Sequence, residues 1–323
     1  MSSLRLLGAA IAAAVLSFSP TTVLHAQTTV TMGSVGSASS SLWPLYIGLT
    51  NGFFDAEGIK IDVVFAQSNA AVIQQLAAGS IDVGINAGLV DPIRAIDKGA
   101  SAAIIRLEIS PPPYLLLSKP AITSLADLKG KIITVGGAKD ITRILTDRVL
   151  KANGVEPSSV DYSYAGSTSA RLSALKSGAV DAAIVLPPYN FYGESAGFKP
   201  LAQISDVVKD LPFAGMVANT KWAAANHATI EKVLSAYDRS VAWFYDPANR
   251  NKAVDIMVEV SKGNKEDVEK TYDFMQKGRF YVATSAISRS KLNNVVNALV
   301  ELGDLEKPVP MDKLVLPGAK LED

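Results

Sequence analysis

The sequence predicts an α/β protein with two similar lobes and a cleft between them. From residue 29 to about residue 185, short β-type runs alternate with helical patterns, as is typical of α/β sheets. Residues 61–85 also align without a gap to residues 160–184. Copies this far apart indicate two related lobes, because solenoid repeats have periods of roughly 20–50 residues. With 323 residues, of which 48% are hydrophobic, the chain can fill both cores.

The first half of the chain is predicted to begin with a strand over residues 29–35. A helix over residues 41–50 follows, because Ser41 can cap its N-terminus and Asn51-Gly52 can end it. The same alternation predicts strands over residues 59–65, 81–85 and 101–107 and helices over residues 69–78 and 89–97.

The internal repeat justifies the elements of the second half. In each copy a strand is followed by a Ser-rich turn, a helix, a glycine and a second strand. The helix ends at Gly79 in the first copy and at Gly178 in the second. The alternation therefore continues through residues 131–185. After about residue 221 the pattern becomes helical, over residues 221–244, 248–261, 265–276 and 287–302.

Two proline-containing segments divide the chain. Pro111-Pro112-Pro113 lies within residues 109–117, and prolines cannot occupy a central strand, so we expect a crossing to the second lobe there. Residues 206–219, with Pro212 and Gly215, are the expected return. We expect hinge closure at residues 108–114 and 206–215. The predicted parts are residues 27–110 for the first part of lobe one, 111–212 for lobe two, and 213–323 for the return to lobe one and the C-terminal helices.

Residues 1–26 are interpreted as a signal peptide that does not belong to the fold. Arg5 precedes an apolar run over residues 6–18, and Ala26 is the small residue that signal peptidase prefers. The chain has no cysteine, which excludes a lipoprotein anchor, a disulfide, a thiolate metal site and a Cys nucleophile. We therefore expect a soluble, exported protein of the periplasm without a lipid anchor. The formal net charge of zero argues against a nucleic-acid partner.

Small and polar residues fill the turns that follow the predicted strands. Ligands of open α/β sheets bind beyond the carboxyl ends of the strands, where helix N-termini offer free N–H groups and a partial positive charge. Several such turns facing one another across two lobes suit a small anion. Ser, Asn, Asp and Gly also cap helices in α/β proteins, so a purely structural role stays open for each turn. The turns cover residues 36–41, 67–69, 86–88, 136–140 and 166–169.

Four segments of the chain carry a family resemblance. Residues 43–59 contain Trp43-Pro44 and a later Gly-Phe-Phe, and residues 124–131 read SLADLKGK. Residues 76–84 contain the pattern L-x-x-G-x-I-D, and residues 175–183 contain the related pattern L-x-x-G-x-V-D-A-A. Together these motifs resemble the substrate-binding proteins of nitrate, sulfonate and taurine ABC transporters, which share their fold with thiamine-precursor proteins. The resemblance implies a type II periplasmic-binding-protein fold with two lobes, a hinge and a central cleft. It also implies a small-molecule ligand, an inner-membrane ABC permease as partner, and neither metal nor cofactor.

Position by position, the resemblance also implies a set of ligand contacts. The implied ligand-binding residues are Ser40, Ser41, Trp43, Gln67, Ser68, Asn69, Asn86, Gly88, Ala138, Asp140, Ile141, Thr142, Ser167, Thr168, Pro188 and Tyr189. The candidate aromatic walls of the cleft are Trp43, Tyr46, Tyr189, Tyr192 and Phe213. Trp43 and Tyr189 are the preferred two, because each follows a turn that faces the cleft. Many members of the family have an acidic residue before the proline where this chain has Leu186-Pro187, which leaves the ligand open.

The charged residues near the turns do not decide the ligand class. Lys139, Arg143 and Arg171 can pair with an anion, although such residues more often form a solvated face. Asp140 and Glu108 can instead accept hydrogen bonds from the amine of a zwitterion. The expected ligand is a small organic anion or zwitterion of the sulfonate, taurine, nitrate or aromatic carboxylate class.

We expect a monomeric binding protein that delivers this ligand to an ABC importer, and not an enzyme. Two alternatives remain open, a ligand-sensing protein that docks on a receptor and a binder of a pyrimidine thiamine precursor. The segment Gly193–Gly197 fits the G-x-S-x-G elbow of hydrolases, but that elbow must directly follow a strand. Pro187 and Pro188 come shortly before it, so we do not expect hydrolysis.

Overall fold

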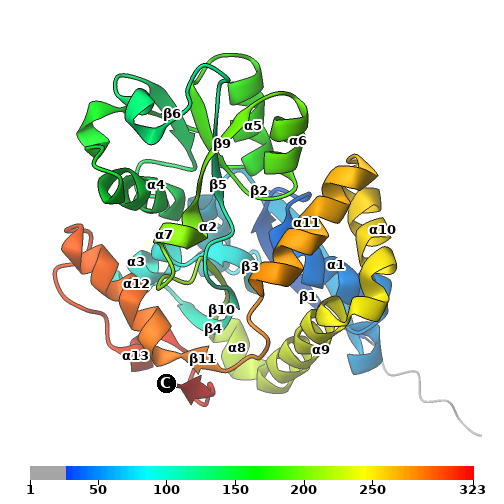
Figure 1. The fold of residues 1–323 in the computed structure, drawn as a ribbon. Coiled ribbons are helices and arrows are strands. Elements are labelled where there is room, and N and C mark those ends of the chain that lie inside the picture. Colours follow the sequence, from blue (N-terminus) through cyan, green and yellow to red (C-terminus); the bar gives the residue numbers. More distant parts are fainter. Residues whose placement is uncertain (1–26) are drawn as a thin grey trace, which may run out of the picture.

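The computed structural model describes residues 27–323, which form two lobes, each built on a five-stranded sheet (Figure 1). The expected signal peptide over residues 1–26 lies outside the described residues. In Figure 1 the second lobe is the green one at the top, and the C-terminal helices, yellow to red, lie with the blue and cyan first lobe below.

The first sheet combines the N-terminal strands with one strand from much later in the chain. Its strands are β1 (Thr28–Val35), β2 (Ile59–Ala66), β3 (Val83–Gly88), β4 (Ala102–Ile109) and β10 (Ala214–Asn219), in the order β2-β1-β3-β10-β4. The first three strands are parallel, whereas β10 lies antiparallel between β3 and β4. The connecting helices are α1 (Trp43–Thr50), α2 (Asn69–Ala78) and α3 (Val90–Asp97), with the short 3-10 helices η1 (Ser40–Leu42) and η2 (Asp55–Glu57).

The second sheet repeats this plan with the middle of the chain. Its strands are β5 (Leu115–Ser118), β6 (Ile132–Val135), β7 (Asp161–Tyr164), β8 (Ala182–Val185) and β9 (Lys199–Gln203), in the order β7-β6-β8-β5-β9. Strand β6 is parallel to β7 and β8, and β5 is antiparallel to β8 and β9. The helices are α4 (Ile141–Ala152), α5 (Thr168–Lys176), α6 (Tyr189–Ser195) and α7 (Ile204–Val207), with η3 (Leu125–Leu128) and η4 (Pro157–Ser159).

The C-terminal third is mostly helical. It contains α8 (Thr220–Ala225), α9 (His227–Tyr245), η5 (Pro247–Asn249), α10 (Arg250–Ser261), α11 (Lys265–Gly278), α12 (Arg289–Glu301) and α13 (Met311–Leu314), and the two-stranded pair β11 (Ile287–Ser288) and β12 (Leu321–Glu322). Helices α9 and α10 pack on α1, and α12 packs on α3. No helix among residues 27–323 is both long enough and apolar enough to cross a membrane.

The chain passes between the two sheets twice. It leaves the first sheet after Ile109 and enters the second at Leu115, and it returns to the first sheet at Ala214. Tyr114 and Phe213, one from each crossing, pack edge-on with ring centroids 4.9 Å apart. The two crossings therefore lie side by side between the lobes.

One expected strand differs in a way that matters for the cleft. The strand expected over residues 81–85 runs from Val83 to Gly88, so Asn86 and Gly88 end a strand and do not form a turn. The chain returns to the first sheet within the expected segment 206–219, which ends in the central strand β10, whose residues Ala214 and Gly215 pair with β3. The sequence did not predict this strand, because its burial in the sheet depends on partners distant in sequence.

Three expected helices also begin or end differently. The helix over residues 41–50 begins with a 3-10 turn, and only residues from Trp43 onward are α-helical. The helix over residues 221–244 is broken at Asn226, whose side chain donates to Trp222 O at 2.9 Å and ends α8. Residues 287–288 form a strand, and Ser288 then caps α12.

Candidate ligand-binding cleft

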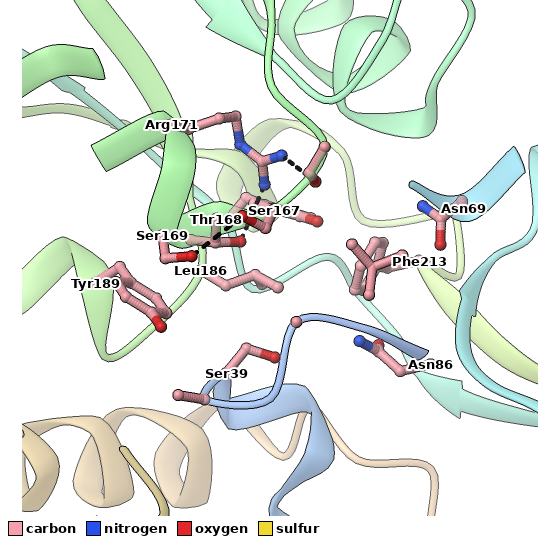
Figure 2. A pocket seen from close by; sticks show the side chains of 15 residues that line it. Ser39, Asn69, Asn86, Ser167, Thr168, Ser169, Arg171, Leu186, Tyr189 and Phe213 are labelled. Atoms are coloured by element: carbon pink, nitrogen blue, oxygen red, sulfur yellow. Dashed lines mark hydrogen bonds between the residues drawn. The ribbon is translucent and has the colours of Figure 1, made fainter. Parts of the chain in front are cut away.

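A cleft with a cavity volume of about 40 Å³ lies between the lobes. The turn after β1, the start of α2 and the end of β3 line it from the first lobe, and the turn before α5 lines it from the second (Figure 2). The lining residues are Val35, Gly36, Ala38, Ser39, Asn69, Asn86, Tyr114, Gly166, Ser167, Thr168, Ser169, Arg171, Leu186, Tyr189 and Phe213.

Arg171 is the only cationic side chain among the described residues that line the cleft, and it is 2% exposed. Its Nε donates to Ile184 O at 2.7 Å, its Nη1 to the carbonyls of Ala165 and Gly166 at 2.9 and 2.8 Å, and its Nη2 to Thr168 Oγ1 at 3.0 Å. All four partners are neutral oxygens, so these bonds orient the guanidinium without neutralising its charge. A buried charge without a counter-ion is costly, which favours an anion in the cleft.

The N-terminus of α5 adds to this positive end of the cleft. Ser167 caps the helix by accepting the N–H of Ala170 at 3.2 Å, and Thr168 and Ser169 begin its first turn. The free N–H groups at a helix start carry a partial positive charge. The lining from the second lobe thus combines a fixed cation, a helix dipole and hydroxyl donors on one side of the cleft.

Asn86 forms the opposite side, on the first lobe (Figure 2). Its backbone is left-handed, with φ of 53°, and its N–H donates to Glu108 Oε2 at 2.7 Å. Its side-chain Oδ1 is buried and has no partner among the described residues. The amide of Asn69 is instead engaged on both sides, because its Nδ2 donates to Asp140 and its Oδ1 accepts from Gly88 N–H. Asn86 is therefore the amide side chain in the first lobe that is available to a ligand.

Aromatic and aliphatic groups form the walls. Tyr114 and Phe213 come from the two crossings, and Leu186 and Tyr189 come from the end of β8 and the start of α6. Burial raises the pKa of the hydroxyls of Tyr114 and Tyr189, so both phenols remain neutral hydrogen-bonding groups. An organic group attached to an anion finds apolar contacts here.

The two lobes touch around the cleft. The N–H of Ser40 donates to Pro187 O at 2.9 Å, and Asn69 Nδ2 lies 3.2 Å from Asp140 Oδ2. The turns of the two repeat copies also meet, because a Cβ added at Gly166 would lie 2.1 Å from Gln67 O. On the rim, Lys139 Nζ pairs with Asp304 at 2.9 Å. This is the arrangement of a closed cleft.

The structure brings together part of the predicted site. Among the predicted residues, those that line the cleft are Asn69, Asn86, Ser167, Thr168 and Tyr189. Ser39, Tyr114, Arg171, Leu186 and Phe213 also line it and were outside the implied set of ligand contacts, although Arg171 was named as a possible partner of an anion and Phe213 as a possible wall. Of these, Arg171 and Leu186 had a visible signal in their positions beside the repeat turn and the strand end.

Trp43 is not a wall of the cleft, which corrects the prediction. Its side chain is fully buried, its Nε1–H donates to Ala253 O at 2.8 Å, and its ring packs edge-on against Phe244 and Tyr272. The 3-10 turn before α1 directs this side chain into the core. Ser40 and Ser41 are likewise fully buried, and it is Ser39 that lines the cleft, with its hydroxyl 2.5 Å from that of Ser41.

The other predicted residues have structural contacts around the cleft. Ser68 caps α2, and Asp140 caps α4 by accepting the N–H of Thr142 at 2.9 Å. Thr142 Oγ1 accepts from Gly136 N–H, and Ile141 is buried. None of these, nor Gln67, Gly88, Ala138 and Pro188, lines the cleft.

The hydrolase elbow finds no support in the local structure. Ser195 ends helix α6 and does not follow a strand, and its hydroxyl donates to Asp267 at 2.9 Å.

Two sheets joined by a double crossing, with a cleft between them, define a two-lobed periplasmic-binding-protein fold. A sequence model described as NMT1/THI5 like matches residues 39–249, which is more than half of the chain. The chain belongs to the NMT1/THI5-like family.

Solved structures support the same fold. The chain is similar to the alkanesulfonate-binding protein SsuA from Xanthomonas axonopodis pv. citri bound to MOPS, with 19% identity over 90% of this chain and 97% of that one and a TM-score of 0.73. It is similar to a ligand-binding component of an ABC-type import system from Staphylococcus aureus with zinc bound (15% identity, 91% and 98% covered, TM-score 0.75). The nitrate-binding protein NrtA from Synechocystis PCC 6803 is also similar (16% identity, 89% and 84% covered, TM-score 0.69). A sequence comparison with curated proteins finds no match.

Proposed function

We propose that this chain is the solute-binding component of an ABC importer and that it captures a small organic anion between its lobes. The observation that carries the proposal is Arg171, a 2% exposed guanidinium that lines the cleft and is held only by neutral oxygens. In this proposal the protein is exported to the periplasm, works as a monomer and performs no catalysis.

The contacts around the cleft favour an anion over a zwitterion. Glu108 and Asp140 were the candidate acceptors for a ligand amine. Glu108 is fully buried and accepts from the Asn86 backbone, and Asp140 accepts from Thr142 and Asn69. Neither lines the cleft. Sulfonates, nitrate and carboxylates therefore fit better than taurine. The similar proteins from Xanthomonas and Synechocystis are named for alkanesulfonate and nitrate, which are both anions.

The walls favour an organic anion. Tyr114, Phe213 and Leu186 offer apolar surface beside the cationic end, and nitrate has no group to occupy it. A short alkyl or aryl group carrying a sulfonate or carboxylate would place its charge at Arg171 and its apolar part against these side chains. The same reasoning disfavours a neutral pyrimidine, which leaves the charge of Arg171 uncompensated.

A thermal-shift panel tests the proposal. The mature chain is heated with ethanesulfonate, benzenesulfonate, benzoate, nitrate and taurine, and with neutral benzamide as a matched control. The buffer must be cationic, because MOPS and HEPES are themselves sulfonates. An anion at about 100 times its Kd adds about 2.7 kcal/mol and should raise the Tm by several degrees. The proposal would be contradicted if none of the anions raised the Tm, or if benzamide raised it and the anions did not.

The receptor-docking alternative uses the same cleft, so ligand binding does not separate it from transport. Adding the ligand-loaded chain to a candidate ABC permease with its ATPase, reconstituted in nanodiscs, separates the two. Stimulated ATP hydrolysis by the importer supports transport, and its absence with a functional permease contradicts it.

A further inference from the structure

The central strand β10 has one β-bulge in its pairing with β3 and two in its pairing with β4, and two of these three bulges bear on the cleft. Between the pairs Gly215–Ala87 and Val217–Gly84, strand β3 contains one residue more than β10. Between the pairs Ala214–Ile109 and Gly215–Leu107, strand β4 contains the extra residue Glu108. A bulge removes a backbone group from the ladder and redirects a side chain.

A single hydrogen bond joins the two bulges. The N–H of Asn86, which the bulge in β3 frees from the ladder, donates to Glu108 Oε2 at 2.7 Å. Asn86 keeps a left-handed backbone there and lines the cleft, while Glu108 is fully buried behind it. A non-glycine residue adopts this conformation only when its surroundings hold it. The carboxylate of Glu108 is the contact that does so.

The charged groups around Glu108 do not balance its negative charge when Glu108 is ionised. Arg106, on the same strand, pairs with Asp238 of α9 and donates to Val282 O at 2.6 Å. Tyr237 of α9 lies under the Arg106 guanidinium and has its hydroxyl beside Glu108, and Tyr281 is packed nearby. One cation thus faces two carboxylates, so an ionised Glu108 places an uncompensated negative charge directly behind the cleft.

The remaining oxygen of Glu108 can hold a proton. Its Oε1 is buried and has no hydrogen-bond partner among residues 27–323. Burial raises the pKa of Glu108 to about 7, and the Asn86 N–H, the Tyr237 hydroxyl and the nearby Arg106 only partly offset this. A proton on Oε1 leaves Oε2 free to keep its bond with Asn86.

Building on the anionic ligand proposed above, we propose that Glu108 is a positioning residue that holds Asn86 in the cleft and takes up a proton from solvent when the anion binds. The ionised form repels the anion, and the neutral form does not. An anion therefore binds with higher affinity when Oε1 carries a proton, and by linkage its binding promotes that protonation.

Calorimetric titration with ethanesulfonate, benzoate and nitrate tests this inference. Ethanesulfonate and nitrate stay ionised throughout, so any pH dependence of their binding belongs to the protein. Wild type is titrated at about pH 5.5 and 8.5, and again near pH 7 in Bis-Tris and in imidazole, whose ionisation enthalpies differ. We expect about five- to tenfold tighter binding at the lower pH, and proton uptake near pH 7.

Three variants separate proton linkage from structure. Glu108→Gln keeps an acceptor for Asn86 N–H, so it should bind with wild-type affinity at low pH and lose the pH dependence and the proton uptake. Glu108→Leu removes the acceptor and should weaken binding at least tenfold at both pH values. Glu194→Gln is the matched control, since burial also raises the pKa of Glu194 but that residue does not line the cleft, and it should behave as wild type.

The outcomes distinguish the two proposals. Anion binding with the same affinity at both pH values, or a Glu108→Gln variant with the wild-type pH profile, would overturn the role of Glu108 and leave the anionic ligand standing. If none of the three anions binds wild type at either pH, the proposed function fails and the proton linkage fails with it.

Discussion

Arg171 Nη2 donates to Thr168 Oγ1 at 3.0 Å, so the guanidinium lies directly behind the first turn of α5. The same side chain ties the repeat turn to strand β8 through the carbonyls of Ala165, Gly166 and Ile184. Arg171 therefore shapes the anion end of the cleft and also supplies its charge.

Replacing Arg171 by Met should reduce stability as well as binding. It leaves three carbonyls without their donor, which should lower the free energy of unfolding by about 3 kcal/mol. Arg171→Lys retains the charge but cannot reach all these oxygens, so it should recover part of the loss. Urea unfolding measures both. Arg143→Met, which breaks a more exposed pair with Asp147, should cost less than about 1 kcal/mol. Equal losses for Arg171→Met and Arg143→Met would contradict this account.

Gly166→Ala should weaken ligand binding by blocking closure. The new Cβ would lie 2.1 Å from Gln67 O, which belongs to the facing turn of the other lobe. We expect at least a tenfold loss of affinity with little change in stability, because the open form accommodates the methyl group. Small-angle scattering should show that ligand no longer reduces the radius of gyration. Gly137→Ala meets only an ordinary 3.5 Å contact and serves as the control. Unchanged affinity in Gly166→Ala would show that the turns do not meet in the bound state.

Truncating Trp43 should lower stability, whereas truncating Tyr189 should lower ligand affinity. Trp43→Ala removes a fully buried ring from the cluster with Phe244 and Tyr272 and should cost about 3–5 kcal/mol. Tyr189→Ala removes a cleft wall and should lower affinity for an aryl anion while changing stability by about 1 kcal/mol or less. Thermal unfolding with and without benzenesulfonate separates the two effects. If Trp43→Ala were as stable as wild type but bound benzenesulfonate more weakly, Trp43 would be a wall of the cleft after all.

The stability of the unliganded protein should fall as pH rises through neutrality. The pKa of Glu108 rises from 4.5 to about 7 on folding, so the folded chain holds a proton that the unfolded chain releases. The resulting stabilisation is complete below about pH 4.5 and is lost as pH rises through about 7, with an upper limit of about 3 kcal/mol. Asp91, whose pKa burial raises to about 6, adds to the same trend. Urea unfolding at about pH 5 and 8 should show a shallower decline in Glu108→Gln, and parallel declines in the two proteins would refute the assignment.

Most of the two-lobed fold could be predicted from the internal repeat, because Gly79 and Gly178 end equivalent helices in the two copies. Local signals also found the turn residues Ser167 and Thr168. They did not find Arg171 as a buried group, since only the tertiary fold decides whether a charged side chain one turn into a helix is covered. Tyr114 and Phe213 were missed as a pair because they are distant in sequence and meet only where the chain crosses twice.

The bulges at Asn86 and Glu108 had no visible signal in the sequence. A bulge depends on the register between strands, and β10 enters the sheet from more than a hundred residues later in the chain. Trp43 was misplaced for a related reason. The 3-10 turn before α1 rotates the helix start, and the sequence pattern predicted a regular helix from residue 41.

Whether the anion binds at Arg171 can be measured by calorimetric titration of wild type, Arg171→Met and Arg143→Met with ethanesulfonate and benzoate, in a cationic buffer near pH 6. We expect wild type and Arg143→Met to bind one anion per chain, and Arg171→Met, still folded by circular dichroism, to bind neither. Binding of either anion to Arg171→Met with wild-type affinity would contradict the assignment of the anion site to the buried guanidinium.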